Sequence, residues 1–368
     1  MMERIVKEGK ITFARFMEMA LYHPQYGYYN SEKERIGKSG DYYTSPTVHK
    51  MFGELIAKQL KEMWRTMGRG QFTVAEIGAN SGWLCHDIIH SVRKKYPDFY
   101  DHLHYCIIET NPYAGDKQRL LLNSSGPADK KVSWHSYTKD GFSFDKIEGC
   151  FLSNEFVDAL PVHRLRVKNK VLKEIYVGYN GVNFFETEGE VSTHLIKEYL
   201  ERLPLSLQEG QECEVNLCAV DWLKHISEKL QKGFVITIDY GDTIDRIYRE
   251  GSLSGTVRCF YKHTVNRDYY HRPGEQDITA HVDFTTLMDM GKVFGLEVTG
   301  FTKQSHYFIA LGILERLNTM KNDLDTILKV KNLFHPEGMG EVFKVLIQHK
   351  NIEDPHLESL RPLHLITL

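Results

Sequence analysis

The feature that most constrains the fold is a glycine-containing turn between a buried strand and a helix. Residues 72–77 read Phe-Thr-Val-Ala-Glu-Ile, which is typical of a buried strand, and a helical segment follows the turn. Gly78 and Gly82 flank Asn80, which gives the pattern E-x-G-x-N-x-G from Glu76 onward. Such a turn lets a nucleotide-like ligand approach the backbone closely and meet the N–H groups of the helix. A tight structural turn without a ligand is the alternative.

Strand-like and helix-like segments alternate through much of the remaining chain. The strands are predicted at 72–77, 104–109, 132–135, 149–153, 233–239, 296–302 and 306–313, and the helices at 82–95, 111–122, 282–294 and through most of 318–349. This alternation predicts an α/β fold in which helices cover both faces of a parallel sheet.

Three stretches fall outside this alternation. Residues 1–70 look helical, and Ser45 is placed to cap a helix that follows it. Residues 163–190 alternate apolar and polar side chains around an Asn-Gly pair, which predicts an antiparallel hairpin. Residues 242–275 are polar, basic and rich in tyrosine, which predicts a long loop or lid. The basic part of that stretch, residues 246–272, could steer an acidic partner or could be a solvated loop.

A second acidic residue, Glu109, stands at the end of the next predicted strand. Its distance along the chain from Glu76 fits one helix and one strand. An acid at this place can bind the ribose hydroxyls of an adenosine, and both nicotinamide enzymes and other nucleoside-binding proteins use the device. Glu109 therefore supports a nucleoside ligand without identifying the cofactor, and a surface carboxylate is the alternative.

Two further carboxylates follow the fourth predicted strand, in the segment Ser153-Asn154-Glu155-Phe-Val-Asp158. The carboxyl edge of an open α/β sheet lines the ligand crevice. Glu155 and Asp158 are three residues apart, so on a helical turn they would share one face and could hold a cation such as a guanidinium. Helix capping by Asn154, with solvated acids after it, is the alternative.

Composition argues against several other classes of protein. Lys and Arg total 46 and Asp and Glu total 49, so the formal charge of −3 gives no support to a nucleic-acid partner. No stretch approaches the roughly 18 uninterrupted apolar residues of a membrane-spanning helix. The six cysteines suggest no disulfide framework, and the histidines lack the spacing of a helical metal site. We expect a cytoplasmic protein, or one of the mitochondrial matrix if a presequence is missing.

The turn at 76–82 resembles the first motif of class I S-adenosylmethionine methyltransferases, E/D-x-G-x-G-x-G, with Asn80 at the middle glycine. Asparagine tolerates a positive φ better than most other residues, so the turn can keep its shape. A nicotinamide dinucleotide would instead require G-x-G-x-x-G, because its pyrophosphate sits on the turn.

Many segments together resemble the MidA family, which is related to a mitochondrial complex I assembly factor that is a protein arginine methyltransferase. The resemblance runs nearly end to end. The segments that carry it are Phe13–Glu18, His23–Tyr29, Gly40–Pro46, Met51–Leu55, Glu76–Leu84, Asn154–Val162, Ile238–Gly241, Asp277–Phe284 and Met339–Leu346.

This resemblance implies a class I methyltransferase fold with a Rossmann-like, mostly parallel sheet and an antiparallel strand near the C-terminus. The implied parts are a helical N-terminal extension, a methyltransferase core in two pieces, a β insertion and a C-terminal helical segment, at 1–70, 71–162 with 213–315, 163–212 and 316–368. The resemblance also implies S-adenosyl-L-methionine as cofactor and a protein substrate, with arginine as the expected acceptor. A respiratory complex I subunit or a homologue of one is a candidate partner.

The residue roles are hypotheses for a methyltransferase. The cofactor-binding residues are expected to be Glu76, Gly78, Ala79, Asn80, Gly82, Glu109 and Asn154. Glu155 and Asp158 are expected to clamp the acceptor guanidinium, while Asp41, with Tyr42, closes the pocket. Two other functions remain open: a non-catalytic assembly protein that kept the cofactor fold, and a nicotinamide-dependent oxidoreductase.

Overall fold

The computed structural model describes residues 1–31, 40–41, 44–111, 113–123, 130–249, 251–320 and 324–362 of the 368-residue chain. The chain folds into two compact units. The small-sheet unit comprises Met1–Tyr42, Val157–Trp222 and Gly241–Met290, and the large-sheet unit comprises Tyr43–Phe156, Leu223–Tyr240 and Gly291–Leu368. Three elements run from one unit into the other: α9 (Leu217–Lys229), β12 (Leu230–Asp242) and α11 (Phe284–Val293).

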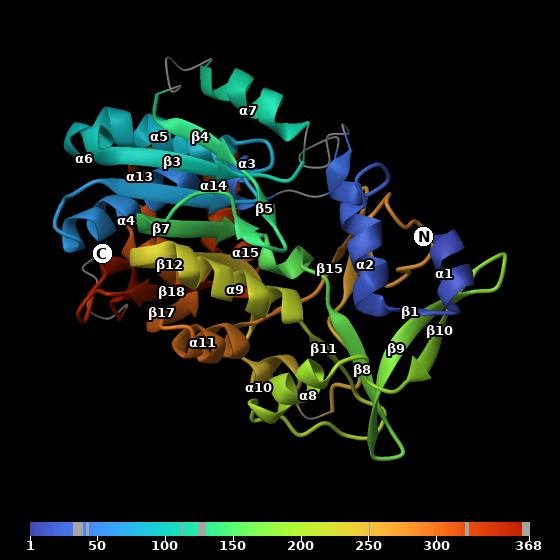
Figure 1. Ribbon diagram of the computed structural model, residues 1–368. Coiled ribbons are helices and arrows are strands. Elements are labelled where there is room, and N and C mark those ends of the chain that lie inside the picture. Colours follow the sequence, from blue (N-terminus) through green and yellow to red (C-terminus); the bar gives the residue numbers. More distant parts are fainter. Residues whose placement is uncertain are drawn as a thin grey trace. The chain divides into compact units, whose positions relative to one another are not determined.

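The large-sheet unit is built on seven strands in the order β17-β18-β12-β7-β2-β3-β4, and Figure 1 shows them following one another from β4 to β17. Their bounds are β2 (Phe72–Ile77), β3 (Leu103–Ile108), β4 (Val132–His135), β7 (Ile147–Asn154), β12, β17 (Glu297–Lys303) and β18 (Phe343–Lys350). Neighbouring strands from β4 to β12 are parallel, whereas β18 is antiparallel to both β12 and β17. This confirms the predicted α/β sheet with one antiparallel strand near the C-terminus.

The register places the ends of β2, β3 and β7 at one edge of the sheet, because Ile77 is paired with both Ile108 and Ser153. The other elements of this unit are α3 (Ser45–Val48), α4 (Met51–Thr66), α5 (Trp83–Lys95), α6 (Pro97–His102), α7 (Ala114–Asn123), β5 (Tyr137–Thr138), β6 (Gly141–Phe142), α12 (Gln304–Ala310), α13 (Ile313–Thr319), α14 (Leu324–Phe334), α15 (Met339–Val342) and the 3₁₀ turn η3 (Glu358–Leu360).

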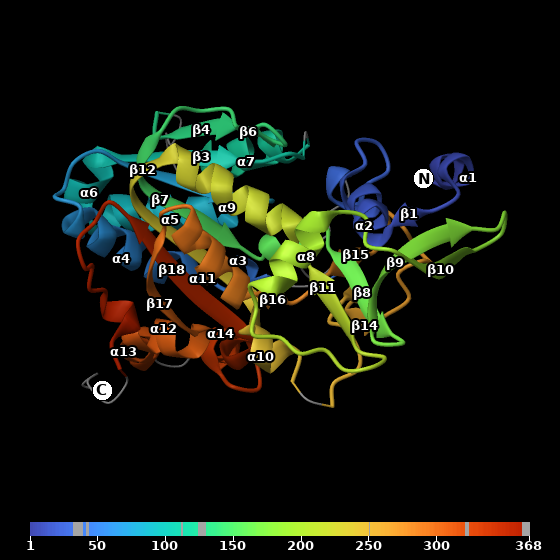
Figure 2. The same ribbon diagram turned by 60° about the horizontal axis from the view of Figure 1, so that its bottom comes forward.

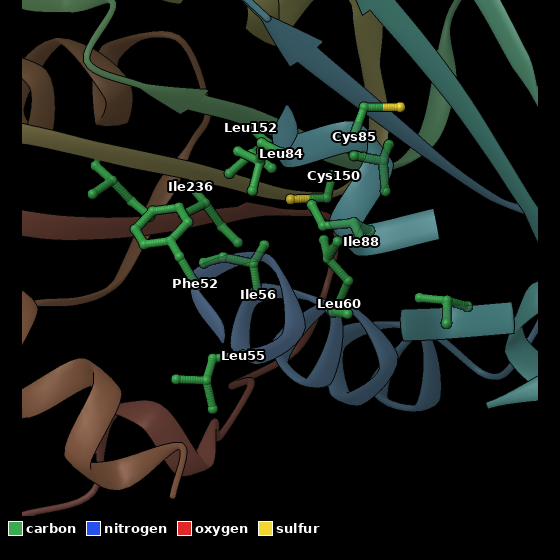
Figure 3. Close-up of a cluster of buried hydrophobic side chains, with 14 of the residues drawn as sticks. Phe52, Leu55, Ile56, Leu60, Leu84, Cys85, Ile88, Cys150, Leu152 and Ile236 are labelled. Carbon is green, nitrogen blue, oxygen red and sulfur yellow. The ribbon is translucent and has the colours of Figure 1, made fainter. Parts of the chain in front are cut away.

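A hydrophobic core lies between α4, α5 and one face of the large sheet. Alternate residues of β12, namely Phe234, Ile236 and Ile238, belong to it because successive side chains of a strand point to opposite faces. Each such side chain contributes about 1.5–3 kcal/mol by leaving water. Figure 3 labels ten core residues: Phe52, Leu55, Ile56, Leu60, Leu84, Cys85, Ile88, Cys150, Leu152 and Ile236.

The structure corrects the sequence prediction near the C-terminus. Residues 306–313 were expected to form a strand, but they lie in α12 and α13, and residues 343–350 form β18 where helix was expected. A short apolar run fits a buried strand and a buried helix equally well by periodicity, so pairing with neighbouring strands decides between them. The predicted helix cap at Ser45 is also wrong, because Thr44 and Thr47 form a capping box at the start of α3.

The small-sheet unit contains a five-stranded sheet of order β1-β9-β8-β11, with β10 paired to β9. Its elements are α1 (Met2–Glu8), β1 (Ile11–Thr12), α2 (Phe13–Tyr22), η1 (Tyr28–Asn30), η2 (Val157–Ala159), β8 (His163–Lys168), β9 (Val171–Tyr179), β10 (Phe184–Gly189), α8 (His194–Glu201), β11 (Glu212–Val215), α10 (Ile244–Ile247), β13 (Arg258–Tyr261), β14 (Thr264–Asn266), β15 (Asp277–Thr279) and β16 (Val282–Asp283).

The predicted hairpin at 163–190 is confirmed. Figures 1 and 2 show β9 and β10 side by side, and Tyr179 pairs with Phe184 across a turn in which Asn180 Oδ1 accepts hydrogen bonds from two backbone N–H groups. The prediction of a long loop at 242–275 is wrong, because this stretch contains α10 and two strands of a three-stranded sheet of order β14-β13-β15. Strand pairing between short, polar segments leaves little periodic signal in a sequence.

Candidate functional site

The turn that follows β2 has the left-handed backbone that the sequence pattern predicts. Gly78, Asn80 and Gly82 have φ values of 73°, 48° and 83°. The Gly78 N–H donates to Ile108 O at 3.0 Å, and the Gly82 N–H donates to Ala79 O at 2.8 Å, after which α5 begins. Glycine has no Cβ penalty in this conformation, and asparagine is one of the few other residues that adopt it readily.

A side chain at either glycine would also be crowded by a neighbouring side chain. A Cβ on Gly78 would stand 3.0 Å from Phe156 Cδ2, and a Cβ on Gly82 would stand 3.0 Å from Gln118 Cγ. Gly78 and Asn80 are exposed, whereas Ala79 and Gly82 are buried. The turn therefore presents bare backbone on its open side, which suits the close approach of a nucleoside-type group.

Glu109 follows β3 directly and binds this turn. Its Oε2 accepts a 2.9 Å hydrogen bond from Asn80 N–H, and its Oε1 accepts 2.9 Å bonds from the N–H groups of Thr110 and Asn111. Burial raises the pKa of Glu109, and these three bonds act against that rise. A carboxylate has about four acceptor positions, so three bonds from the backbone leave room for a further donor such as a ribose hydroxyl.

Glu76, the last acidic residue of β2, is buried beneath the turn. Tyr105 on β3 donates a 2.7 Å hydrogen bond from its hydroxyl to Glu76 Oε2. Burial raises the pKa of Glu76 to about 7, the Tyr105 hydrogen bond lowers it, and the charge of Glu109 raises it. Glu76 is therefore poised to change protonation near neutral pH, so a cationic group close to it would favour its ionised form.

The end of β7 supplies the next part of the site. Glu155 has a φ of 52°, and its Oε1 accepts hydrogen bonds from Ser45 N–H at 2.9 Å and from Asn154 Nδ2 at 3.1 Å. The Phe156 N–H donates to Asp239 Oδ2 at 3.2 Å. Asn154 Oδ1 is buried and accepts no hydrogen bond from the residues that the structure describes. A ligand amine or hydroxyl could therefore donate to it, because buried polar atoms normally have a partner.

Asp158 does not share a helical turn with Glu155, which corrects that expectation. Asp158 lies in the 3₁₀ turn η2, whereas Glu155 precedes this turn in a left-handed conformation that breaks the helical path. Asp158 is buried, and its backbone carbonyl accepts a 2.9 Å hydrogen bond from Ala280 N–H. The boundary between the two units also falls between Phe156 and Val157.

Asp41 lies in the small-sheet unit. It is buried, and its carboxylate accepts hydrogen bonds from the Tyr28 hydroxyl at 2.7 Å and from Lys262 N–H at 2.8 Å. Tyr42, which the sequence prediction placed beside it, lies outside the described residues. The large-sheet unit thus brings together the seven predicted cofactor residues and Glu155, while Asp41 and Asp158 belong to the other unit.

Sequence reasoning missed two residues that support the turn. Glu76 on β2 is paired with Ile107 on β3, and Tyr105 lies two residues before Ile107. Alternate residues of a strand share a face, so Tyr105 could have been predicted to lie beside Glu76. Gln118 on α7 donates a 2.7 Å hydrogen bond from Nε2 to Asn80 O, and no motif in the sequence marked it. Among the described residues, no group of three or more His, Cys, Asp or Glu side chains could hold a metal ion.

Within the part of the chain that the structure describes, no helix is long and apolar enough to cross a membrane. The open left-handed turn, the strand-end acid Glu109 and the orphan acceptor of Asn154 fit a cofactor with an adenosine end and a polar end. The residues present thus satisfy the needs of an S-adenosyl-L-methionine molecule.

Comparisons with known proteins agree with this fit. Residues 55–302, more than half of the chain, match a family model described as "Putative S-adenosyl-L-methionine-dependent methyltransferase". Two relatives are each 26% identical to this chain: the mitochondrial protein arginine methyltransferase NDUFAF7 homolog of Drosophila melanogaster, over 97% of this chain and 85% of its own, and the mitochondrial protein arginine methyltransferase NDUFAF7 of Homo sapiens, over 96% and 83%.

Two crystal structures from Burkholderia thailandensis are also similar. The first, a protein bound to S-adenosyl-homocysteine, has a TM-score of 0.88 and 25% identity and covers 97% of this chain and 92% of its own. The second has a TM-score of 0.86 and 25% identity, with coverages of 99% and 95%. The similarity therefore spans nearly the whole chain in both sequence and structure.

Proposed function

Because the chain belongs to this family of S-adenosyl-L-methionine-dependent methyltransferases, we propose that it methylates an arginine side chain of a protein partner. The family and the cofactor predicted from the sequence are confirmed. The observation that carries the proposal is the similarity to relatives named protein arginine methyltransferase, which extends over 96–97% of this chain.

Arginine is a demanding acceptor, and its chemistry makes carboxylates near the acceptor useful. The guanidinium is delocalised and protonated, so its nitrogens are poor nucleophiles. S-adenosyl-L-methionine supplies a methyl group that its sulfonium charge has already activated. A guanidinium nitrogen attacks the methyl carbon, the new N–C bond forms as the S–C bond breaks, S-adenosyl-homocysteine leaves, and the displaced proton passes to a carboxylate or to water. Orientation of the nucleophile is then the protein's main contribution.

Glu155 is our first choice for this orienting role. Its Oε1 accepts hydrogen bonds from Ser45 N–H and from Asn154 Nδ2, so the carboxylate has a fixed position directly after β7. A carboxylate that accepts two nitrogens of a guanidinium leaves the third to react. Asp158 and Asp41 belong to the small-sheet unit, and their roles toward the acceptor stay predictions from the sequence.

The proposal is tested by methyl transfer to protein. The full chain is incubated with radiolabelled S-adenosyl-L-methionine and an extract of cells that lack the protein, and labelled bands are examined for methylated arginine by mass spectrometry. Respiratory complex I subunits or their homologues are candidate acceptors for a purified assay. Label on arginine supports the proposal. Label only on another residue type contradicts the arginine assignment, and binding of S-adenosyl-homocysteine with no transfer to any protein favours a non-catalytic assembly role.

A further inference from the structure

Gln118 is the one fully buried side chain of α7 that reaches the turn after β2. Its Nε2 donates a 2.7 Å hydrogen bond to Asn80 O, and its Oε1 accepts a 2.9 Å bond from the indole N–H of Trp134. The relative exposure of Gln118 is 0%. Both ends of the Gln118 amide are thus hydrogen-bonded. Trp134 fixes the orientation of the amide, and the amide in turn binds the Asn80 carbonyl.

Asn80 occupies the position where the related motif has a glycine, and its backbone is held from two directions. Glu109 accepts the hydrogen bond of its N–H, and Gln118 donates to its carbonyl. The φ of 48° is unfavourable for a residue with a Cβ, although less so for asparagine than for most. A left-handed residue persists when its surroundings fix both of its peptide groups.

Gln118 also packs against the last residue of the turn. Its Cγ would stand 3.0 Å from a Cβ at position 82, so the side chain fills the space beside Gly82. The Trp134 ring that anchors the amide is itself covered by the Arg119 guanidinium, 3.8 Å from the ring centroid. Two hydrogen bonds of Gln118 therefore connect β4 to the turn, and Arg119 covers the Trp134 end of this connection.

We propose that Gln118 is a positioning residue for the cofactor, which keeps the non-glycine turn at Asn80 in the conformation that binds S-adenosyl-L-methionine. It acts through the Asn80 carbonyl, not by contact with the reacting atoms. The inference does not depend on the identity of the methyl acceptor, because its measurement is cofactor binding alone.

The test replaces Gln118 by methionine, which keeps the length of the side chain and removes both hydrogen bonds. We expect the Kd for S-adenosyl-homocysteine, measured by isothermal titration, to rise about tenfold, as the loss of a buried hydrogen bond predicts. The matched control is Gln304→Met, since Gln304 is equally buried in the large-sheet unit and donates a 2.8 Å bond to Leu333 O. The control should lower Tm by a similar amount with an unchanged Kd.

A second substitution separates positioning from general loss of stability. Asn80→Gly removes the Cβ that disfavours the left-handed turn, so it should restore a good part of the affinity in the Gln118→Met background. A Kd within twofold of the parental value in folded Gln118→Met protein overturns the proposal, as does a loss that Asn80→Gly leaves untouched. If Gln118→Met fails to fold, Trp134→Phe removes the indole N–H, together with part of the ring, and an unchanged Kd in that variant overturns the proposal equally.

Discussion

The backbone N–H of Asn80 donates a 2.9 Å hydrogen bond to the carboxylate of Glu109, so the acid that follows β3 fixes the turn that follows β2. The two segments are 29 residues apart in sequence and meet because their parallel strands end at the same edge of the sheet. Glu109 therefore organises the turn, and we propose that its remaining acceptor position binds a ligand.

This double task predicts a large effect of Glu109→Ala on cofactor binding. We expect the Kd for S-adenosyl-L-methionine to rise at least tenfold, about 1.4 kcal/mol, because the turn loses a partner and so does the ribose in the proposed binding mode. Titration calorimetry of the folded variant measures it. Glu337→Ala removes an exposed glutamate of the same unit and serves as control. An unchanged affinity for folded Glu109→Ala would remove Glu109 from the site.

The raised pKa of Glu76 predicts a pH-dependent stability. Between the ordinary glutamate value of 4.5 and the folded value of about 7, the folded protein holds a proton that the unfolded chain has released. The free energy of unfolding therefore falls as pH rises through this window, by at most about 3 kcal/mol from this group. Glu76→Gln cannot lose that proton, so its advantage over the parent should grow from pH 5 to pH 8.

Urea unfolding of both proteins at pH 5, 6, 7 and 8 measures this difference. Glu148→Gln provides the control, since Glu148 is exposed on β7 and undergoes the same change of charge. A difference between Glu76→Gln and the parent that stays constant with pH would contradict the assignment of Glu76 as the titrating group.

The turn and the sheet could be predicted from sequence because local patterns encode them. Glu76, Gly78, Asn80 and Gly82 lie on one short segment whose residue types alone indicate a left-handed turn. Glu109 was found because a strand end is also a local signal. Strand β18 was missed because the run Val345–Ile347 becomes a strand only by pairing with β12 and β17, which is information that no local window holds.

The supports of the turn could not be predicted for a related reason. Gln118 looks like an ordinary polar residue of a helix, and only the fold reveals that it is buried against Gly82 and bonded to Asn80. The expected pairing of Glu155 with Asp158 on one turn rested on helical spacing. The positive φ of Glu155 takes this residue out of the helical path, so the helical spacing does not apply to it. Glutamate rarely adopts a positive φ, so its residue type gave no sign of this conformation.

Glu155→Gln should separate cofactor binding from methyl transfer. The amide keeps an oxygen that can accept the Ser45 N–H bond, but it loses the negative charge that we propose orients a guanidinium and accepts its proton. We expect turnover to fall by a factor of about 100 or more, while the Kd for S-adenosyl-homocysteine stays within about threefold. Radiolabel transfer and calorimetry measure the two. Full methyl transfer with unchanged peptide affinity would exclude Glu155 from the catalytic residues.

The last prediction concerns the macromolecular nature of the acceptor. A small metabolite needs only a concave pocket at the edge of the sheet, whereas this chain carries a separate small-sheet unit with its own core. The predicted basic segment 246–272 belongs to that unit, and Arg249 and Lys262 are exposed in it. Exposed cations at the edge of a binding surface change the association rate and the salt dependence of binding more than they change the chemical step.

Reversing both charges, as Arg249→Glu with Lys262→Glu, should therefore raise the KM for an acidic protein acceptor several-fold, weaken its dependence on ionic strength and leave kcat nearly unchanged. The same double reversal at Lys329 and Lys331, two exposed residues of α14, is the control and should change neither quantity. Steady-state methyl transfer at 50 and 300 mM salt measures both variants. If the reversed protein keeps the parental KM and salt dependence, the segment does not recognise the partner. If a free amino acid or metabolite proves to be the efficient acceptor, the proposal of a protein substrate fails as a whole, because such an acceptor does not need a surface that binds a second protein chain.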